Sequence, residues 1–382
     1  MKMINQLISF LREHYQTKDF IPLHAPRFIG NEKAYVLNAI DSTFVSSVGA
    51  YVDQFERDMA KYIESPSAVV TVNGTSALHC ALLLAGVKAQ DYVITQPLTF
   101  IATCNAIAYC NAEPIFIDVD RQTLGLSPQA LDAWLDEFSF IDDQGYCRHK
   151  KNHRIIRACV PMHTFGHPAD LDGLLDVCRR WNLKMVEDAA ESLGSLYKGR
   201  HTGTLGELGI LSFNGNKIIT TGGGGMILTN KELGQKAKHL TTTAKKPHPY
   251  EYVHDEIGFN YRMPNINAAL GCAQLEQLEF FIEKKRALAS RYSDFFKNSS
   301  LQFIIEPAHC RSNYWLNAVI CDDLDQRNEL LQKTNDSGVM TRPIWHLMNQ
   351  LAMYKNALCG PLNHSEWLVD RVVNLPSSVE EC

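Results

Sequence analysis

Short apolar runs alternate with segments of helical periodicity over more than half of the chain. The run SAVVTV at 67–72 precedes the helical pattern TSALHCALLLAG at 75–86, and DYVITQ at 91–96 precedes TFIATCNAIAYC at 99–110. Further apolar runs lie at 113–119, 155–162, 184–188, 208–213 and 225–230, with helical patterns from Ser127-Pro128 and at 169–181. Almost wholly apolar strands are typical of a parallel sheet covered by helices on both faces. The pattern therefore predicts a doubly wound α/β fold.

Beyond residue 264 the pattern changes. A long helical segment at 265–296 carries Leu270, Leu275, Leu278 and Phe281 at helical spacing, and shorter mixed elements follow it. We expect an N-terminal helix and arm at 1–25, a large α/β domain at 26–260 and a smaller C-terminal α+β domain at 261–382.

Composition and charge exclude several classes of protein. The 382 residues carry a net charge of -5, which argues against a nucleic-acid surface. No window holds the apolar stretch that a membrane helix needs, and the N-terminus lacks the pattern of a signal peptide. The eleven cysteines are odd in number and form no CxxC pair. We therefore expect buried free thiols, a cytoplasmic protein and no metal site.

The segment SFNGNKIITTGGGG at 212–225 is the most unusual stretch. It fails the Walker pattern because Lys217 follows Asn216 and precedes Ile218. It also fails the dinucleotide pattern, since Ile227 stands where the last glycine belongs and the run leads into a strand. The glycines instead predict a close approach of the backbone to something bulky, with unusual φ angles permitted.

Three features converge if the apolar runs share one sheet. Gly74, Thr75 and Ser76 lie between a strand and a helix, where amides and hydroxyls bind phosphate. Asp188 ends an apolar strand, and a buried carboxylate there needs a cationic partner. Lys217 follows another strand and lies outside any charge run, as a reactive amine does.

Taken singly, each feature has an ordinary alternative: an N-cap by Thr75 or Ser76, a helix-capping Asp188, a surface Lys217. Together they match what pyridoxal phosphate requires, which is a phosphate anchor, a partner for the pyridine nitrogen and an aldehyde-binding amine.

At these residues the chain resembles the sugar aminotransferases of the DegT/DnrJ/EryC1/StrS family, which have the fold-type I architecture of pyridoxal-phosphate enzymes. The resemblance includes NGTSAL, QPLTFIATCNAI, PMHTFGHPADLDGL, VEDAAES, SFNGNK, TTGGGGM and GFNYRMPNINAALG in one order. The segments STFVSSVG and TRPIWHLMNQLAMY look most like the LegC-type branch.

The resemblance implies a role for each matching residue. Lys217 would form a Schiff base with the cofactor and carry a proton between cofactor and substrate, and Asp188 would hold the pyridine nitrogen protonated. Phe100 would lie against the pyridine ring, although a core aromatic is the alternative. Glu191 stands where relatives often carry His or Gln, so its role stays open. The phosphate would contact Thr75, Ser76 and Ser212, together with Asn260 of the neighbouring subunit. Sugar-nucleotide contacts would come from Ser46, Ser47, Arg342 and Trp345.

The segment HTFGHP places His163 and His167 four residues apart, as two metal ligands on a helix would be. Gly166 and Pro168 disfavour a helix there, so we interpret this segment as a structural loop.

The resemblance implies a homodimer with shared active sites and transfer of an amino group from L-glutamate to C4 of a nucleotide-linked 2-acetamido-4-keto-6-deoxyhexose. UDP is the favoured carrier, and the amino sugar would be of the legionaminic acid or bacillosamine type. One alternative is a pyridoxal-phosphate sugar dehydratase, whose relatives replace the lysine with histidine. The other is a non-catalytic member that binds the cofactor or the sugar nucleotide without turnover.

Overall fold

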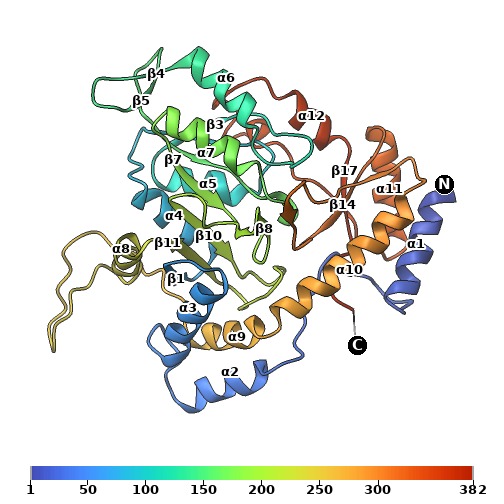
Figure 1. The fold of residues 1–382 in the computed structure, drawn as a ribbon. Coiled ribbons are helices and arrows are strands. Elements are labelled where there is room, and N and C mark those ends of the chain that lie inside the picture. The colour runs from blue at the N-terminus through green and yellow to red at the C-terminus, as the bar shows by residue number, and fades with distance from the viewer. Residues whose placement is uncertain (1, 381–382) are drawn as a thin grey trace.

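The computed structural model describes residues 2–380, and its centre is one large sheet (Figure 1). Seven of its eight strands run in the same direction, and β11 runs opposite to both of its neighbours. The predicted mostly parallel α/β architecture is therefore confirmed. In spatial order the strands are β1 (Ser67–Thr71), β11 (Gly225–Thr229), β10 (Leu208–Ser212), β7 (Lys184–Asp188), β6 (Ile156–Val160), β2 (Tyr92–Thr95), β3 (Glu113–Phe116) and β16 (Leu358–Cys359).

Helices cover both faces of this sheet, which explains why its strands are apolar on both sides. On one face, α4 (Gly74–Leu84), α5 (Ile101–Tyr109) and α8 (Lys231–Thr241) pack with the sheet in one apolar cluster. On the other face, α6 (Pro128–Phe138) and α7 (Leu171–Arg180) bury Leu131 and Leu174 against it. Ser127 begins α6 as predicted, because its hydroxyl accepts the N–H of Ala130 at 3.2 Å.

A second lobe is built on a four-stranded sheet whose order is β12 (Gln302–Phe303), β14 (Asn317–Ile320), β17 (Val372–Leu375) and β15 (Arg342–Pro343). The N-terminal helix α1 (Lys2–His14) and α11 (Leu324–Asp336) belong to this lobe. Ile4, Leu7 and Leu11 of α1 share its core with Leu330. The two ends of the chain therefore build one lobe.

The predicted long helix is two helices, α9 (Asn265–Leu275) and α10 (Leu278–Phe296), that follow each other across a short break. Helix α9 packs against α2 (Glu32–Asp41) and α3 (Ala50–Tyr62) beside the large sheet. Helix α10 runs across to the second lobe (Figure 1). The break between α9 and α10 lets one apolar stretch of the sequence contribute side chains to two hydrophobic cores.

The C-terminal segment crosses between the lobes more than once. After β15 it passes through η2 (Met348–Gln350) and adds β16 to the edge of the large sheet beside β3. It then forms α12 (Asn363–Val369) and returns to the small sheet as β17. The remaining elements are η1 (Thr164–Gly166) and two small sheets, one of β13 (Cys310–Arg311), β8 (Leu196–Tyr197) and β9 (Arg200–His201), the other of β4 (Ser139–Ile141) and β5 (Cys147–His149).

Residues 243–258 project from the body of the molecule after α8 (Figure 1). We call this segment the arm from here on; it is distinct from the N-terminal segment at 1–25. Hydrogen bonds close its base, because the Thr243 N–H donates to the Phe259 carbonyl at 3.0 Å. Among the described helices, none has both the length and the apolar character needed to cross a membrane.

Candidate active site

The carboxyl ends of β1, β7 and β10 meet beside a cavity of about 330 Å³. Ligands of open α/β sheets bind at this edge, because loops after parallel strands converge there. Eight of the residues singled out from the sequence line this one cavity, although they are far apart in the chain: Gly74, Thr75, Phe100, Asp188, Glu191, Ser212, Lys217 and Trp345.

The first turn of α4 forms one wall of the cavity. Asn73 caps this helix, because its side-chain oxygen accepts the N–H of Ser76 at 2.8 Å. The alternative of an N-cap by Thr75 or Ser76 is therefore wrong. A Cβ on Gly74 would lie 3.0 Å from the Cβ of Ser212, so the turn lies directly against the end of β10. The N–H groups of a first helical turn lack intrahelical acceptors and carry partial positive charge, which suits a phosphate.

The glycine run supports this wall from behind. A Cβ on Gly225 would lie 2.5 Å from the carbonyl carbon and oxygen of Asn73 and 2.7 Å from the Gly74 nitrogen. The predicted close approach is real, but its partner is the backbone of the β1–α4 turn. Only Gly222 of the run has a positive φ, at 78°.

Asp188 is buried at the end of β7, with 5% of its surface exposed. The Thr103 hydroxyl donates to its Oδ2 at 2.8 Å, and the Ala190 N–H donates to its Oδ1 at 3.2 Å. Burial raises the pKa of this carboxyl, while Thr103, Ala190 and the charge of Lys217 lower it. A buried carboxylate of this kind gains most from a cationic ligand group.

Lys217 lies between a carboxyl group and an aromatic face. Its Nζ is 3.4 Å from Oε1 of Glu191 and 3.9 Å from the centre of the Trp315 ring. The Trp315 indole is fixed in turn, because its N–H donates to the Asn216 carbonyl at 2.7 Å. The alternative of an ordinary surface lysine does not fit, since only 13% of the side chain is exposed.

Glu191 is held by the loop at 163–168, which the sequence predicts to be structural. The Phe165 N–H donates to Oε2 of Glu191 at 2.9 Å, and Phe165 has a positive φ of 57°. His163 contacts Glu187 at 3.0 Å and accepts the N–H of Ala169. His163 therefore stabilises the fold, while the backbone N–H of Phe165 fixes Glu191.

Neither of the two aromatic candidates is fully buried. Phe100 has 51% of its surface exposed although it borders the cavity, so the alternative of a core aromatic is wrong. Trp345 packs on Phe165 with ring centres 5.3 Å apart.

Five other candidates do not line the cavity of this chain: Ser46, Ser47, Ser76, Asn260 and Arg342. Ser76 lies inside α4 and is buried. The Ser46 carbonyl accepts the N–H of Asn265 at 2.6 Å, and the segment around it is exposed. Asn260 is exposed at the base of the arm, and Arg342 is exposed on the edge strand β15.

Three residues of the site were not predicted from the sequence: Asn73, Thr103 and Trp315. Asn73 directly precedes Gly74, so its capping role was open to prediction from the helix start alone. Thr103 lies one turn after Phe100, and Trp315 comes from the other lobe, nearly one hundred residues from Lys217. Neither of these two leaves a local signal.

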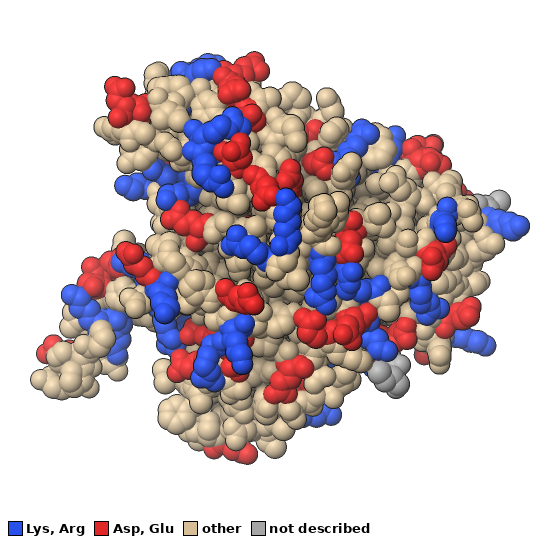
Figure 2. Space-filling model, in the orientation of Figure 1, with Lys and Arg blue, Asp and Glu red and all other residues tan. Residues whose placement is uncertain are grey.

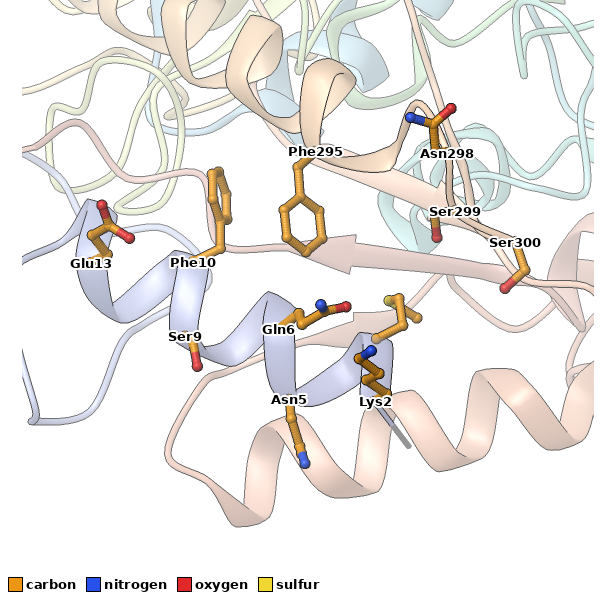
Figure 3. Close-up of a pocket in the computed structure, with 11 residues that line it drawn as sticks. Lys2, Asn5, Gln6, Ser9, Phe10, Glu13, Phe295, Asn298, Ser299 and Ser300 are labelled. Atoms are coloured by element: carbon orange, nitrogen blue, oxygen red, sulfur yellow. The ribbon is translucent and has the colours of Figure 1, made fainter.

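A larger hollow of about 820 Å³ lies between α1 and the end of α10 (Figure 3). Its floor is apolar, with the rings of Phe10 and Phe295 4.8 Å apart. It is an open groove, and among the described residues that line it Lys2 and Glu13 are the charged ones. The larger volume of this groove therefore does not identify the active site. The active site is the smaller cavity, where an amine, carboxylates and a helix N-terminus converge.

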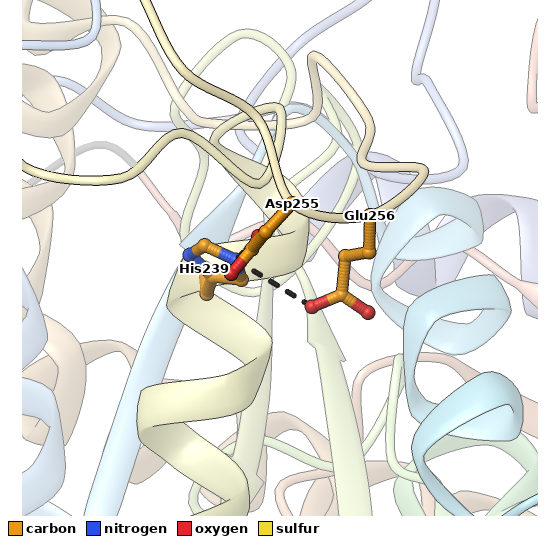
Figure 4. A group of neighbouring side chains, drawn as sticks. All are labelled: His239, Asp255 and Glu256. Carbon is orange, nitrogen blue, oxygen red and sulfur yellow. Dashed lines mark hydrogen bonds and ion pairs between the residues drawn. The ribbon is translucent and has the colours of Figure 1, made fainter.

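Within the described residues, one group has the spacing of metal ligands: His239, Asp255 and Glu256 (Figure 4). His239 Nε2 is 2.7 Å from Oδ1 of Asp255 and 3.5 Å from Oε1 of Glu256. Lys236 pairs with Glu256, and Lys246 pairs with Asp255. These ion pairs satisfy the carboxylates and tie the arm to α8.

The sequence profile of the DegT/DnrJ/EryC1/StrS aminotransferase family matches residues 27–381. The chain belongs to this family. It is 38% identical to the GDP-perosamine synthase of Escherichia coli O157:H7 over 360 residues, which cover 94% of this chain and 93% of the relative. It is 35% identical to the GDP-perosamine synthase of Caulobacter vibrioides, with the same coverage.

Among solved structures, the chain resembles the aminotransferase TlmJ of Streptoalloteichus hindustanus, with a TM-score of 0.84 and 27% identity over 94% of this chain and 93% of TlmJ. The predicted fold-type I architecture and the family are thus confirmed. The protein is a pyridoxal-phosphate-dependent sugar aminotransferase. The narrower assignment to the LegC-type branch stays a prediction.

The residues of the cavity fit this cofactor. The first turn of α4 offers donors for a phosphate, Asp188 offers a carboxylate for a pyridine nitrogen, and Lys217 offers an amine for an aldehyde. When bound, the cofactor supplies an electron sink for charge that develops on a substrate carbon.

Proposed function

We propose that this enzyme transfers an amino group from L-glutamate to C4 of a nucleotide-linked 4-keto-6-deoxyhexose. The observation that carries the proposal is the convergence of Lys217, Asp188 and the first turn of α4 on one cavity. The family explains the class of reaction, and the cavity explains how this chain performs it. The product serves the synthesis of surface polysaccharides that contain amino sugars.

We assign the cofactor contacts as follows. Gly74 and Thr75 of α4 and Ser212 of β10 bind the phosphate, and Ser76 follows Thr75 in the same first turn of α4. Phe100 lies against the face of the pyridine ring, a common use of an exposed aromatic beside a ligand. Asp188 keeps the pyridine nitrogen protonated, and its raised pKa makes a cationic partner especially favourable.

Lys217 binds the aldehyde and moves the proton at the reacting carbon. Borohydride treatment of the purified yellow enzyme should attach the cofactor to Lys217, and attachment to any other lysine contradicts the assignment. The Lys217→Ala variant should retain some cofactor through the phosphate contacts but lose turnover, because proton transfer lacks its base.

Two nucleotides are candidates for the carrier of the substrate sugar, UDP and GDP. The segments STFVSSVG and TRPIWHLMN favour a UDP-linked 2-acetamido sugar, whose product is of the legionaminic acid or bacillosamine type. Three similar relatives, 32% to 38% identical, are named GDP-perosamine synthases, and they favour GDP. On balance we favour GDP, since those relatives match over nearly the whole chain.

A panel of 4-keto-6-deoxyhexoses on GDP, UDP and CDP tests the substrate, with L-glutamate as donor and the amino sugar measured by mass spectrometry. Efficient amination of one GDP- or UDP-linked sugar supports the proposal. Release of water from the sugar without amine transfer supports a dehydratase instead, although that class replaces the lysine with histidine. A cofactor spectrum that glutamate leaves unchanged supports a non-catalytic member.

The contact to the sugar diphosphate is the least constrained part of the proposal. Arg342 is exposed, and Trp345 three residues later borders the cavity. Guanidinium groups bind phosphate oxygens in a fork, so we propose Arg342 for this role, with Ser46 and Ser47 as further contacts. Arg342→Ala should raise KM for the sugar nucleotide while leaving the glutamate half-reaction nearly intact.

A homodimer with shared active sites is also part of the proposal. Large apolar side chains are exposed on the segment around α2 and on the arm, and the arm tip carries few charges on the face seen in Figure 2. Apolar patches of this extent favour a protein partner. The exposed residues are Phe28, Ile29, Leu37, Ile40, Phe44, Val45, Val48, Tyr250, Tyr252, Val253 and Ile257.

The test combines two variants that fail for different reasons. Asn260→Ala should weaken cofactor retention, because we assign Asn260 to the phosphate of the neighbouring subunit. Mixing this variant with Lys217→Ala should restore part of the activity through hybrid sites. A fully active monomer in sedimentation equilibrium would refute the shared site. The same proposal places the enzyme in the cytoplasm, as the sequence predicts.

A further inference from the structure

Glu191 and Lys217 form a close pair inside the cavity, and the roles assigned above use only the lysine. Their Nζ and Oε1 atoms are 3.4 Å apart, and only 1% of the Glu191 side chain is exposed. The other carboxyl oxygen of Glu191 accepts the Phe165 N–H, so the carboxyl group is fixed in place. An amide would satisfy the same Phe165 N–H, so that contact does not explain an ionisable residue here.

The surroundings of the pair favour the neutral, protonated form of Glu191. Burial raises the pKa of Glu191 to about 7, against the opposing charge of Lys217. Asp188 is the other carboxylate that acts on Glu191. The charge of Lys217 also acts on His24, whose pKa is lowered by burial and then by the charges of Lys285 and Lys217.

We propose that Glu191 is the proton partner of Lys217. The ammonium of Lys217 gives its proton to the Glu191 carboxylate, which leaves a neutral amine and a neutral carboxylic acid, and the reverse transfer restores the ion pair. No proton has to enter or leave the cavity in this step. The inference rests on the proposed role of Lys217 as the aldehyde-binding amine.

The physical reason lies in two requirements that conflict in a buried site. Lys217 must be neutral to attack an aldehyde, yet it must accept a proton when it acts as a base. A neighbouring carboxyl group that can accept this proton and return it meets both requirements, whereas the amide of a glutamine cannot take part in this exchange. Trp315 supports the charged form, because an ammonium over an indole ring is stabilised by the ring electrons.

The first experiment measures the amine directly in protein freed of cofactor. Competitive acetylation followed by mass spectrometry gives the neutral fraction of Lys217 as a function of pH. The variants are Glu191→Gln, which keeps size and shape, Glu191→Asp, which keeps an acid, and the surface control Glu113→Gln.

A carboxylate within about 4 Å shifts the pKa of an amine by roughly one to three units. The Glu191→Gln variant should therefore titrate Lys217 at least about one pH unit lower, which makes acetylation at pH 8 about tenfold faster. Glu191→Asp should lie between this variant and the wild type, and Glu113→Gln should match the wild type. An unchanged midpoint for Lys217 in Glu191→Gln would overturn the proposal.

The second experiment is the single-turnover reaction of the loaded enzyme with glutamate between pH 5.5 and 9. The wild type should show a break near neutral pH, above which the ionised Glu191 raises the basicity of Lys217. Glu191→Gln should lose this break, and Glu191→Asp should regain a break at a shifted pH. A merely structural glutamate would instead change the rate by the same factor at every pH.

The two proposals fail in different ways. If borohydride does not attach the cofactor to Lys217, the proposed function fails. If it does, but the pH break of the wild type persists in Glu191→Gln, only the proton partnership fails.

Discussion

Gly225→Ala places a methyl group where the glycine run meets the turn that begins α4. The added Cβ would lie 2.5 Å from the carbonyl carbon and oxygen of Asn73 and 2.7 Å from the nitrogen of Gly74. All three atoms belong to the backbone, so no side-chain rotation can relieve the contact. The strand itself is fixed on both sides, by Thr71 of β1 and Ser212 of β10.

The substitution should weaken both folding and cofactor binding. Carbon atoms pack at about 3.5–4.0 Å, so the turn must move by roughly 1 Å or more. Overpacking of this kind costs about 1–3 kcal/mol of stability. The displaced N–H groups are those that we assign to the cofactor phosphate, and one hydrogen bond to a charged group contributes about 1.5–3 kcal/mol. Cofactor affinity should therefore fall by about one to two orders of magnitude.

The assay is a titration of cofactor-free protein with pyridoxal phosphate, followed by absorbance, together with urea unfolding of the same samples. Gly215→Ala is the matched control, because a Cβ at Gly215 would meet no atom within 4 Å. The control should bind the cofactor like the wild type. Weaker folding of Gly225→Ala with unchanged cofactor affinity would refute the reasoning, since the clash would then leave the phosphate turn undisturbed.

Three further predictions concern buried polar groups. Thr103→Val removes the hydroxyl that donates to Asp188, so cofactor affinity should fall about tenfold or more in the same titration. Burial lowers the pKa of Lys285 from 10.5 to about 7, so the unfolded chain binds more protons between these values and stability should rise by roughly 2–3 kcal/mol from pH 7 to 9. Lys285→Met should abolish this rise in urea unfolding. Burial raises the pKa of Glu191 from 4.5 to about 7, so the folded cofactor-free protein binds more protons in that window. Its stability should fall by roughly 3 kcal/mol as pH rises through the window, and Glu191→Gln should show no such fall in urea unfolding.

Local sequence determined the elements that carry the site. The runs at 67–72, 184–188 and 208–213 predict strands because each contains consecutive apolar residues, and all three correspond to strands of the large sheet. The residues that follow the strands of a parallel sheet lie at one edge, so Gly74, Asp188 and Lys217 are predicted to converge if their strands share one sheet. The order of the strands in the structure makes them neighbours. The order of motifs along the chain was enough to indicate the family.

Tertiary structure alone decided the contacts that tune these residues. Trp315 reaches Lys217 from the second lobe, because it packs in one apolar cluster with Phe213 and Ile218. Burial of Glu191 beside Lys217 depends on the 163–168 loop, whose Phe165 has a backbone conformation that no local pattern predicts. The split between α9 and α10 likewise follows from two cores competing for one apolar stretch. Periodicity records which residues are buried, whereas the partners that bury them come from segments far apart in the chain.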